Sequence, residues 1–204
     1  MKKFFLVLAC YFVQTHYISA HNLAQDRVVI NNKTFVPYIT EDQIKQRIQE
    51  VGQQITRDYA GKNLLLVGVL NGSAIILSDL IREINLDCEM DFLKISSYGN
   101  GTQSSGTITL EKNLSRPITG RDVIIVEDII DSGLSIEYVR NLLMQSNPKS
   151  LKVFSLLVKR ETAKVSFPID YVGFDVPSKF VIGCGLDYAQ KGRNLKSIYA
   201  LAQN

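Results

Sequence analysis

The sequence predicts an α/β fold built on an open, mostly parallel, twisted sheet that is flanked by helices. Continuous apolar runs such as LLLVGVL, residues 64–70, are typical of parallel strands buried on both faces. Amphipathic stretches with helical spacing alternate with these runs, as a parallel sheet with crossover helices requires. A content of 46% hydrophobic and 21% charged residues is that of an ordinary soluble globular protein, and 204 residues suffice for one sizeable domain or two small ones.

The first expected elements are a short strand pair and a long helix. Residues 27–39 predict a strand pair or an edge strand around Asn31-Asn32. Thr40 is expected to begin the helix, because Thr40-Glu41-Asp42-Gln43 forms a capping box. Gly61 lies near the expected C′ position and predicts the end of the helix. Apolar residues recur on one face between these points: Ile44, Ile48, Val51, Ile55 and Tyr59.

The middle of the chain continues the alternation. The strand at 64–70 is followed by a tight turn, Asn71-Gly72-Ser73, and by a helix over 74–84 for which Ser73 is a candidate cap. Residues 88–96 predict a strand, and the polar residues 97–106 predict an exposed mobile loop. The remaining expected elements are strands at 107–111, 123–126, 151–159, 170–176 and 180–186, and a helix from about 133 to 145 that Pro148 stops.

The charge and the metal-binding residue types exclude several classes of function. A net charge of +3 is too small to indicate a nucleic-acid binder, and no long basic run is present. The three cysteines, at 10, 88 and 184, lack metal-ligand spacing and are expected to be buried or bystander thiols in a reducing compartment. Both histidines, at 16 and 21, lie near the N-terminus, which excludes a His-based triad in the core.

Residues 1–20, MKKFFLVLACYFVQTHYISA, differ from the rest of the chain. Two lysines, a short apolar run and small residues at Ile18-Ser19-Ala20 match a secretory signal. The apolar run is too short to span a bilayer, and Leu8-Ala9-Cys10 resembles a lipoprotein site that lies very early. The alternative interpretation is that the true start lies downstream and that this segment is a wrongly assigned extension.

The strand expected at 123–126 ends in an unusual run of polar residues. VIIVEDIIDSGLS, residues 123–135, places Glu127 and Asp128 directly after four aliphatic residues and continues with Asp131-Ser132-Gly133-Leu134-Ser135. Ligands of open α/β sheets bind beyond the carboxyl ends of strands, where a helix N-terminus favours an anion. The two acids suit a sugar diol or water-bound Mg²⁺. A ribose 5-phosphate therefore satisfies both halves of the stretch.

A plainer interpretation of this stretch is a solvated strand end with an Asp helix cap. Two further acids directly on an aliphatic strand argue against it, because burying a lone carboxylate is costly. Neither G-x-x-x-x-G-K-[ST] nor G-x-G-x-x-G occurs in the sequence, so the common nucleotide-binding loops are excluded.

The thirteen-residue stretch resembles the phosphoribosyl-pyrophosphate (PRPP) binding motif of type I phosphoribosyltransferases. Four more segments narrow the resemblance to hypoxanthine(-guanine) phosphoribosyltransferases over about residues 30–200. They are LNGS (70–73), SSYGNGTQSSG (96–106), LLVKR (156–160) and KFVIGCGLDYAQKGRNL (179–195). The resemblance implies the type I phosphoribosyltransferase fold with a small hood subdomain, formed by a single domain over residues 27–204.

For the PRPP motif, the resemblance implies that Glu127 and Asp128 face the ribose hydroxyls and metal-bound water. It implies that Asp131 lies near purine N7 as a general acid/base, a role that typically contributes ~10²–10⁴-fold. The implied phosphate-binding residues are Asp131, Ser132, Gly133, Leu134 and Ser135. The implied cofactor is Mg²⁺, for which the resembling residues are Glu127, Asp128 and Asp187.

On the purine side, the resemblance implies that Lys159 donates to the 6-oxo group. A lysine donor suits an oxo acceptor and not an amino group, so 6-oxopurines are the expected bases. Phe180 is implied to stack on the purine, Val181 to offer backbone groups, and Asp187 to lie at the purine and metal. The plainer alternatives are a solvated lysine, a core aromatic residue and an Asp-containing turn.

Pyrophosphate contacts are implied for Asn71, Gly72 and Arg193, whose planar fork can bind two oxygens. Many family members carry Lys or Arg in place of Asn71, and the family often has a cis peptide at Leu70-Asn71. Ser97 and Tyr98 match the pair in the mobile loop that closes over the site and excludes water.

The predicted function is therefore purine salvage: transfer of phosphoribosyl from PRPP to N9 of hypoxanthine, and of guanine, giving IMP or GMP and pyrophosphate. The nearer alternatives use xanthine or adenine. An alternative from another class is a regulator that senses PRPP and binds nucleic acid, against which the near-neutral charge argues.

The expected partners are PRPP and 6-oxopurine bases, with no nucleic acid and no membrane for the folded domain. The family forms homodimers and homotetramers. Because PRPP is an intracellular metabolite, a cytoplasmic protein is expected, in conflict with the signal-like residues 1–20. That segment is accordingly expected to be a wrong start or an uncleaved extension.

Overall fold

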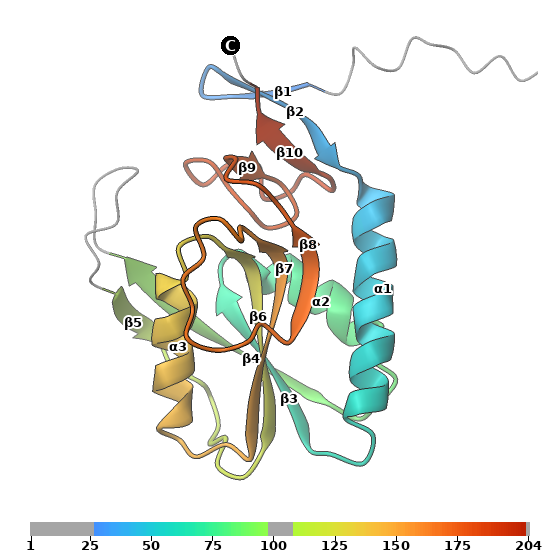
Figure 1. Cartoon of the computed structure of the whole chain (residues 1–204), viewed down its shortest axis with the longest axis vertical. Coiled ribbons are helices and arrows are strands. Elements are labelled where there is room, and N and C mark those ends of the chain that lie inside the picture. The colour runs from blue at the N-terminus through green and yellow to red at the C-terminus, as the bar shows by residue number, and fades with distance from the viewer. Residues whose placement is uncertain (1–26, 98–107, 203–204) are drawn as a thin grey trace, which may run out of the picture.

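The computed structural model describes residues 27–97 and 108–202, which form two sheets and three helices (Figure 1). In the larger sheet β3 pairs in parallel with β4 and β6, β7 pairs in parallel with β6 and β8, and β5 alone is antiparallel, against β4. Its strands in spatial order are β5 (Ile108–Lys112), β4 (Glu89–Ser97), β3 (Leu64–Leu70), β6 (Asp122–Ile130), β7 (Ser150–Val158) and β8 (Tyr171–Asp175). The predicted mostly parallel α/β sheet is confirmed.

The helices cover both faces of this sheet, which explains the continuous apolar runs. Helices α1 (Glu41–Asp58) and α2 (Ser73–Arg82) share one hydrophobic cluster with Leu64 and Leu66 of β3. Helix α3 (Leu134–Met144) shares the other cluster with Leu65 and Val67. Because successive side chains of a strand point to opposite faces, every residue from Leu64 to Val69 is buried.

Local capping signals fix α1 as predicted but not α2. The Thr40 hydroxyl accepts from the Gln43 N–H and the Gln43 side chain accepts from the Thr40 N–H, completing the capping box. Ser73 was expected to cap α2, and that expectation is wrong. Ser73 is the first helical residue, it is fully buried, and its hydroxyl donates to the carbonyl of Val69 at 2.7 Å.

The smaller sheet forms the hood and lies against one end of the main sheet (Figure 1). It is antiparallel throughout, in the order β1 (Val28–Ile30), β2 (Lys33–Ile39), β10 (Ile198–Leu201) and β9 (Val181–Ile182). Asn31 and Asn32, with φ of 48° and 62°, make the tight turn between β1 and β2. Strand β9 is an edge strand, so one side of its backbone has no neighbouring strand.

Three expectations about strands require correction. The strand expected at 180–186 ends after Ile182, because Gly183, Cys184 and Gly185 all have positive φ, which a strand does not allow. Strand β10 was not predicted. The strand expected at 123–126 continues to Ile130, since β7 remains its hydrogen-bonded partner as far as that residue.

None of the helices within residues 27–97 and 108–202 is long and apolar enough to cross a membrane.

Candidate functional site

Two close backbone approaches bring the hood, the β3–α2 turn and the end of β6 together. Gly72 follows β3 and lies directly against Asp128: a Cβ on Gly72 would be 1.6 Å from Oδ2 of that residue. Gly185, in the hood, lies against Gly72: its Cβ would be 2.0 Å from the carbonyl oxygen of Gly72. Three segments far apart in the sequence therefore meet at the carboxyl ends of β3 and β6, where ligands bind in open α/β sheets.

The acids of the PRPP-like motif lie inside the last part of β6. Glu127 is 7% exposed, and its Oε2 atom has no hydrogen-bond partner among the described residues. Burial, with the neighbouring Asp128, raises the pKa of Glu127 well above its ordinary value. Burial also raises the pKa of Asp128 to about 6, opposed by the N–H of Ile129 and by Arg193. Buried carboxyl groups of this kind are stabilised when a hydroxyl group or a cation binds to them.

The loop between β6 and α3 has the form expected of an anion site. Gly133 has a φ of 93°, which favours glycine, and a Cβ there would lie 2.5 Å from the carbonyl oxygen of Lys164. Gly133 is also the N-cap of α3 and has no side chain to cap it, and the Ser132 hydroxyl accepts a long hydrogen bond, 3.4 Å, from the N–H of Leu134. Leu134 is 52% exposed, so it contributes through its backbone.

Two adjoining pockets lie along this loop. The first, of about 230 Å³, is lined by residues of the segment 127–136 that include Asp131, Ser132 and Ser135. The second, of about 200 Å³, is lined by Asn71 and Gly72 together with Glu127, Asp128 and Ser135. Because the pockets share Glu127, Asp128 and Ser135, a single ligand with a phosphate at each end can extend through both.

Asp131 and Lys159 form a direct ion pair. The Nζ atom of Lys159 lies 2.5 Å from Oδ2 of Asp131. Lys159 is buried, at 7% exposure, so the alternative of a solvated lysine is wrong. The Asp131 side chain is 54% exposed. It does not cap α3, and the alternative of an Asp helix cap is also wrong. The structure thus brings together a cation and a carboxylate predicted to act on the same purine.

Phe180 and Val181 lie in the hood, at the beginning of β9. Phe180 is 44% exposed, so it is not an ordinary core residue. Its ring packs against Phe35 at a centroid distance of 6.2 Å and edge-to-face against Tyr188 at 5.6 Å. Val181 is buried in the edge strand β9, which leaves backbone groups free on the side away from β10. An aromatic surface beside free backbone groups suits a flat heterocycle.

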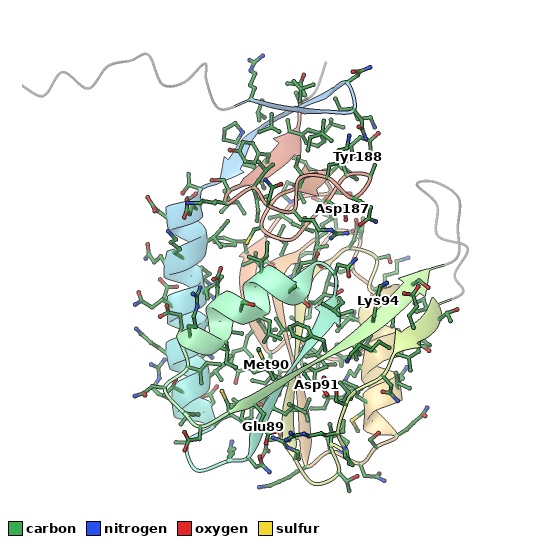
Figure 2. All side chains as sticks on the ribbon, turned by 180° about the vertical axis from the view of Figure 1, so that it is seen from behind. Glu89, Met90, Asp91, Lys94, Asp187 and Tyr188 are labelled. Atoms are coloured by element: carbon green, nitrogen blue, oxygen red, sulfur yellow. The ribbon has the colours of Figure 1, made fainter. Side chains whose placement is uncertain are left out.

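Asp187 and Arg193 form a second ion pair, in the hood loop that Figure 2 shows from behind. Arg193 lies 2.5 Å from Oδ1 of Asp187 and donates to the carbonyl of Gly185 at 2.7 Å. Oδ2 of Asp187 accepts from the N–H of Gln190 at 2.8 Å. The charge of Arg193 lowers the pKa of Asp128, and the charge of Asp187 raises it.

The carboxyl groups at the end of β6 have the chemistry of a site for a divalent cation. No group of three or more metal-ligating side chains gathers in the described ranges. A Mg²⁺ ion needs fewer, since it keeps several waters and binds one or two carboxylates plus substrate phosphates. The unpartnered Oε2 of Glu127 and the adjacent Asp128 fit that requirement. Asp187 fits less directly, because Arg193 and Gln190 already occupy its oxygens.

Of the remaining predicted residues, the structure describes Asn71 and Ser97 but not Tyr98. Asn71 is exposed in the turn after β3, and the Leu70-Asn71 peptide bond is cis, as the resemblance implied. Ser97 is the last residue of β4, and its backbone pairs with Ile108. Tyr98 and the rest of the expected mobile loop lie outside the described residues, so their part in the site stays a prediction.

Sequence reasoning missed the contacts that hold the predicted phosphate loop, residues 131–135. Thr162 donates to Oδ1 of Asp131 at 3.0 Å, and the N–H of Lys164 donates to the carbonyl of Ser132 at 3.0 Å. A backbone amide carries no sequence signal of its own. A hydroxyl three residues after Lys159 was the one available sign.

Comparisons with known proteins agree with this geometry. Residues 39–189 match the family described as phosphoribosyl transferase domain. The chain is 49% identical over 160 residues to the hypoxanthine-guanine phosphoribosyltransferase of Dictyostelium discoideum, which covers 76% of this chain and 89% of that protein. It is 44% identical over 163 residues to the Bacillus subtilis protein of the same name, covering 80% and 91%.

The chain is also similar to a solved structure and to a longer protein. The hypoxanthine phosphoribosyltransferase of Staphylococcus aureus superposes with a TM-score of 0.77 at 40% identity, over 81% of this chain and 90% of that one. The chain is also 47% identical to the bifunctional protein TilS/HprT of Listeria innocua, but it spans only 25% of that relative's length. The chain belongs to the type I phosphoribosyltransferase family, among its hypoxanthine-guanine phosphoribosyltransferases.

Proposed function

We propose that this protein transfers the phosphoribosyl group of PRPP to N9 of hypoxanthine, and of guanine, and releases pyrophosphate. The observation that carries the proposal is the position of Asp131. Asp131 is the first residue of the phosphate loop, and its carboxylate pairs, at 2.5 Å, with the ammonium of the buried Lys159. A group between a phosphate site and a purine-oxygen donor is where the reacting ribose–base bond has to form.

The bound PRPP extends across the two adjoining pockets. Its 5-phosphate is held by the loop from Asp131 to Ser135 and by the N-terminus of α3, where Gly133 provides no capping side chain. Its ribose hydroxyls donate to Glu127 and Asp128, which gives the buried Oε2 of Glu127 a partner. Its pyrophosphate contacts the backbone at Asn71-Gly72 and the guanidinium of Arg193.

The purine binds between the main sheet and the hood. Lys159 donates to the 6-oxo group, the exposed ring of Phe180 stacks on the purine, and the backbone of Val181 in the edge strand contacts its rim. A point-charge donor at Lys159 accepts no hydrogen bond from an amino group, so adenine is disfavoured. The arrangement favours 6-oxopurines, of which hypoxanthine and guanine are the proposed substrates.

The chemical step is a substitution at C1 of the ribose. The bond between C1 and the pyrophosphate oxygen breaks as the bond between N9 and C1 forms, through an oxocarbenium-like state. Asp131 stabilises the positive charge on the sugar. It also accepts the proton from N7 of the purine, which leaves the base of the product neutral. Closure of the loop that begins at Ser97 and Tyr98 keeps water away from the activated C1.

Mg²⁺ is the proposed cofactor. When bound, it neutralises the charge of the pyrophosphate leaving group. Glu127 and Asp128 would hold the cation, and Asp187 is the third candidate residue. The unpartnered Oε2 of Glu127 is the observation that favours this cation.

The decisive experiment replaces Asp131 by Asn and measures IMP formation from PRPP, hypoxanthine and Mg²⁺. Loss of a general acid/base lowers kcat by about 10²–10⁴-fold. Unchanged turnover would remove Asp131 from the mechanism. A panel of hypoxanthine, guanine, xanthine and adenine with the wild-type protein tests the substrate class, and use of adenine alone would overturn the role given to Lys159.

Residues 27–204 are proposed to act as a single phosphoribosyltransferase domain, in the cytoplasm, as a homodimer or homotetramer. PRPP is made inside cells, which supports the location. A structure of the Trypanosoma cruzi hypoxanthine phosphoribosyl transferase addresses the oligomeric state of that enzyme. Light scattering of the purified chain and fractionation of its native cell test both points, and a monomer or an exported protein would contradict them.

A further inference from the structure

The connection between β7 and β8 packs directly against the phosphate loop. The N–H of Lys164 donates to the carbonyl of Ser132 at 3.0 Å, and Gly133 lies against the carbonyl oxygen of Lys164. Two residues further on, the N–H of Ser166 donates to Oε1 of Glu137 at 2.5 Å and its hydroxyl to Oε2 at 3.2 Å. The connection is therefore fixed both to the loop and to the first turns of α3.

A tight turn at the start of this connection brings Thr162 to Asp131. The carbonyl of Lys159 accepts from the N–H groups of Thr162, at 3.1 Å, and Ala163, at 2.8 Å. This turn leaves the Thr162 hydroxyl 3.0 Å from Oδ1 of Asp131 and 3.1 Å from the carbonyl oxygen of the same residue. The hydroxyl has one proton to donate, and a carboxylate oxygen is the stronger acceptor.

The two oxygens of Asp131 thus have different partners. Oδ2 is bound by Lys159 and Oδ1 by Thr162. The Asp131 side chain is 54% exposed, so packing alone does not fix its orientation. Once a purine takes up the ammonium of Lys159, the Thr162 hydroxyl is the contact that continues to hold the carboxylate.

We propose that Thr162 is a positioning residue, which holds Oδ1 of Asp131 so that Oδ2 faces the purine and exchanges between Lys159 and the substrate. The inference rests on the proposed function. It predicts that the hydroxyl acts in the chemical step and not in the binding of PRPP, because the Lys164–Ser132 hydrogen bond holds the phosphate loop independently. Loss of an orienting contact made to a charged group then lowers kcat and leaves the affinity for PRPP intact.

The test compares Thr162→Val, which keeps the shape and removes the hydroxyl, with Thr162→Ser, which keeps the hydroxyl. The valine variant is expected to lose about tenfold in kcat with hypoxanthine, the effect of one hydrogen bond to a charged group. The serine variant is expected to stay within about twofold of wild type. The dissociation constant of PRPP with Mg²⁺, measured by calorimetry, should be the same for all three proteins.

Thr119→Val is the matched control. The hydroxyl of Thr119 also donates one hydrogen bond, to the carbonyl of Ser146 at 2.9 Å, but it precedes β6 and lies at the opposite end of that strand from Asp131. Its kcat should equal that of wild type.

Each possible failure has its own signature. A wild-type protein that makes no nucleotide from PRPP and any 6-oxopurine overturns the proposed function. An active wild type whose kcat is unchanged by Thr162→Val overturns the positioning role alone. A valine variant that loses PRPP affinity in proportion to its activity also overturns that role, because the hydroxyl would then support only the loop.

Discussion

Gly72 leaves no room for a side chain beside Asp128, since a Cβ there would lie 1.6 Å from Oδ2 and 2.3 Å from Cγ of that carboxyl group. The φ of Gly72 is −62°, so any amino acid can adopt its backbone conformation and the constraint is purely steric. We expect Gly72→Ala to displace the carboxyl group and lower kcat/KM for PRPP by about 100-fold, as misplacements of ~1 Å do. Steady-state kinetics measure this effect, and urea unfolding should show a loss of about 1–3 kcal/mol.

Gly120→Ala is the control for this substitution. Gly120 has a φ of 72° and nothing within 4 Å of a Cβ, so alanine there is strained but does not clash. We expect a stability loss of about 1–2 kcal/mol with unchanged activity. Wild-type PRPP kinetics in Gly72→Ala would show that the close approach to Asp128 has no part in substrate binding.

Glu127 should make the stability of the ligand-free protein fall as the pH rises. Because folding raises its pKa, the folded state binds this proton more tightly than the unfolded state, and stability is lost from about pH 4.5 upward. We expect Glu127→Gln to gain stability over wild type as the pH rises from 4.5 to 7, with no gain below 4.5. Urea unfolding without ligands, over a pH series, measures the difference.

Glu50→Gln provides a control of opposite sign. The hydrogen bond from Arg47 lowers the pKa of the exposed Glu50 carboxyl, so its small stabilising effect is present above pH 4.5 and lost below it. The glutamine variant should be slightly less stable than wild type at pH 7. If Glu127→Gln also loses stability at neutral pH, Glu127 has a partner in solution that satisfies its charge.

Replacing Lys159 by Met should weaken the binding of the purine base without weakening the binding of PRPP. Lys159 is 7% exposed and its ammonium pairs with Asp131, so methionine removes a charge-assisted donor while keeping most of the apolar stem. We expect KM for hypoxanthine to rise by about tenfold or more, with KM for PRPP within about twofold of wild type. Lys149→Met removes an exposed lysine that pairs with Asp122 at the opposite end of β6 from Asp131, and it should change neither constant.

Phe180 and Phe35 should respond oppositely to truncation, although their rings are in contact. Phe180 is 44% exposed, so Phe180→Ala should cost little stability but raise KM for the purine, since stacking on a base is worth about 1–3 kcal/mol. Phe35 is fully buried, so Phe35→Ala should cost about 3–5 kcal/mol of unfolding free energy. Thermal unfolding and base kinetics together test the contrast, and equal stability losses would contradict it.

The main sheet was predictable because its signals are local. Strand β3 is apolar on both faces, and the capping box of α1 involves residues three apart. The hood was harder to predict. Strand β10 has four residues, and the run at 180–186 is apolar enough for a strand until three positive φ angles turn it after Ile182. Short strands paired across most of the chain leave no periodic pattern to detect.

The site was predictable only in part for a similar reason. The PRPP-like motif is contiguous, so the loop from Asp131 to Ser135 was located directly. Its supports come from elsewhere: Gly185 against Gly72, and Thr162 against Asp131. Such contacts depend on three-dimensional packing and not on spacing. The individual roles given to the site residues stay predictions until the variants above are measured.

The hood sheet also sets the order in which the two halves of the site can mature during synthesis. Strand β2 emerges early and β9 late, yet neither pairs with the other, because β10 lies between them. Among the described strands β10 is the last to be translated. The hydrogen bonds that hold residues 131–135 come from residues up to Lys164, whereas β9, which carries the proposed purine contact Val181, pairs with β10. On the proposed function, a nascent chain would contain all the residues that hold its phosphate loop before its purine-binding surface is complete.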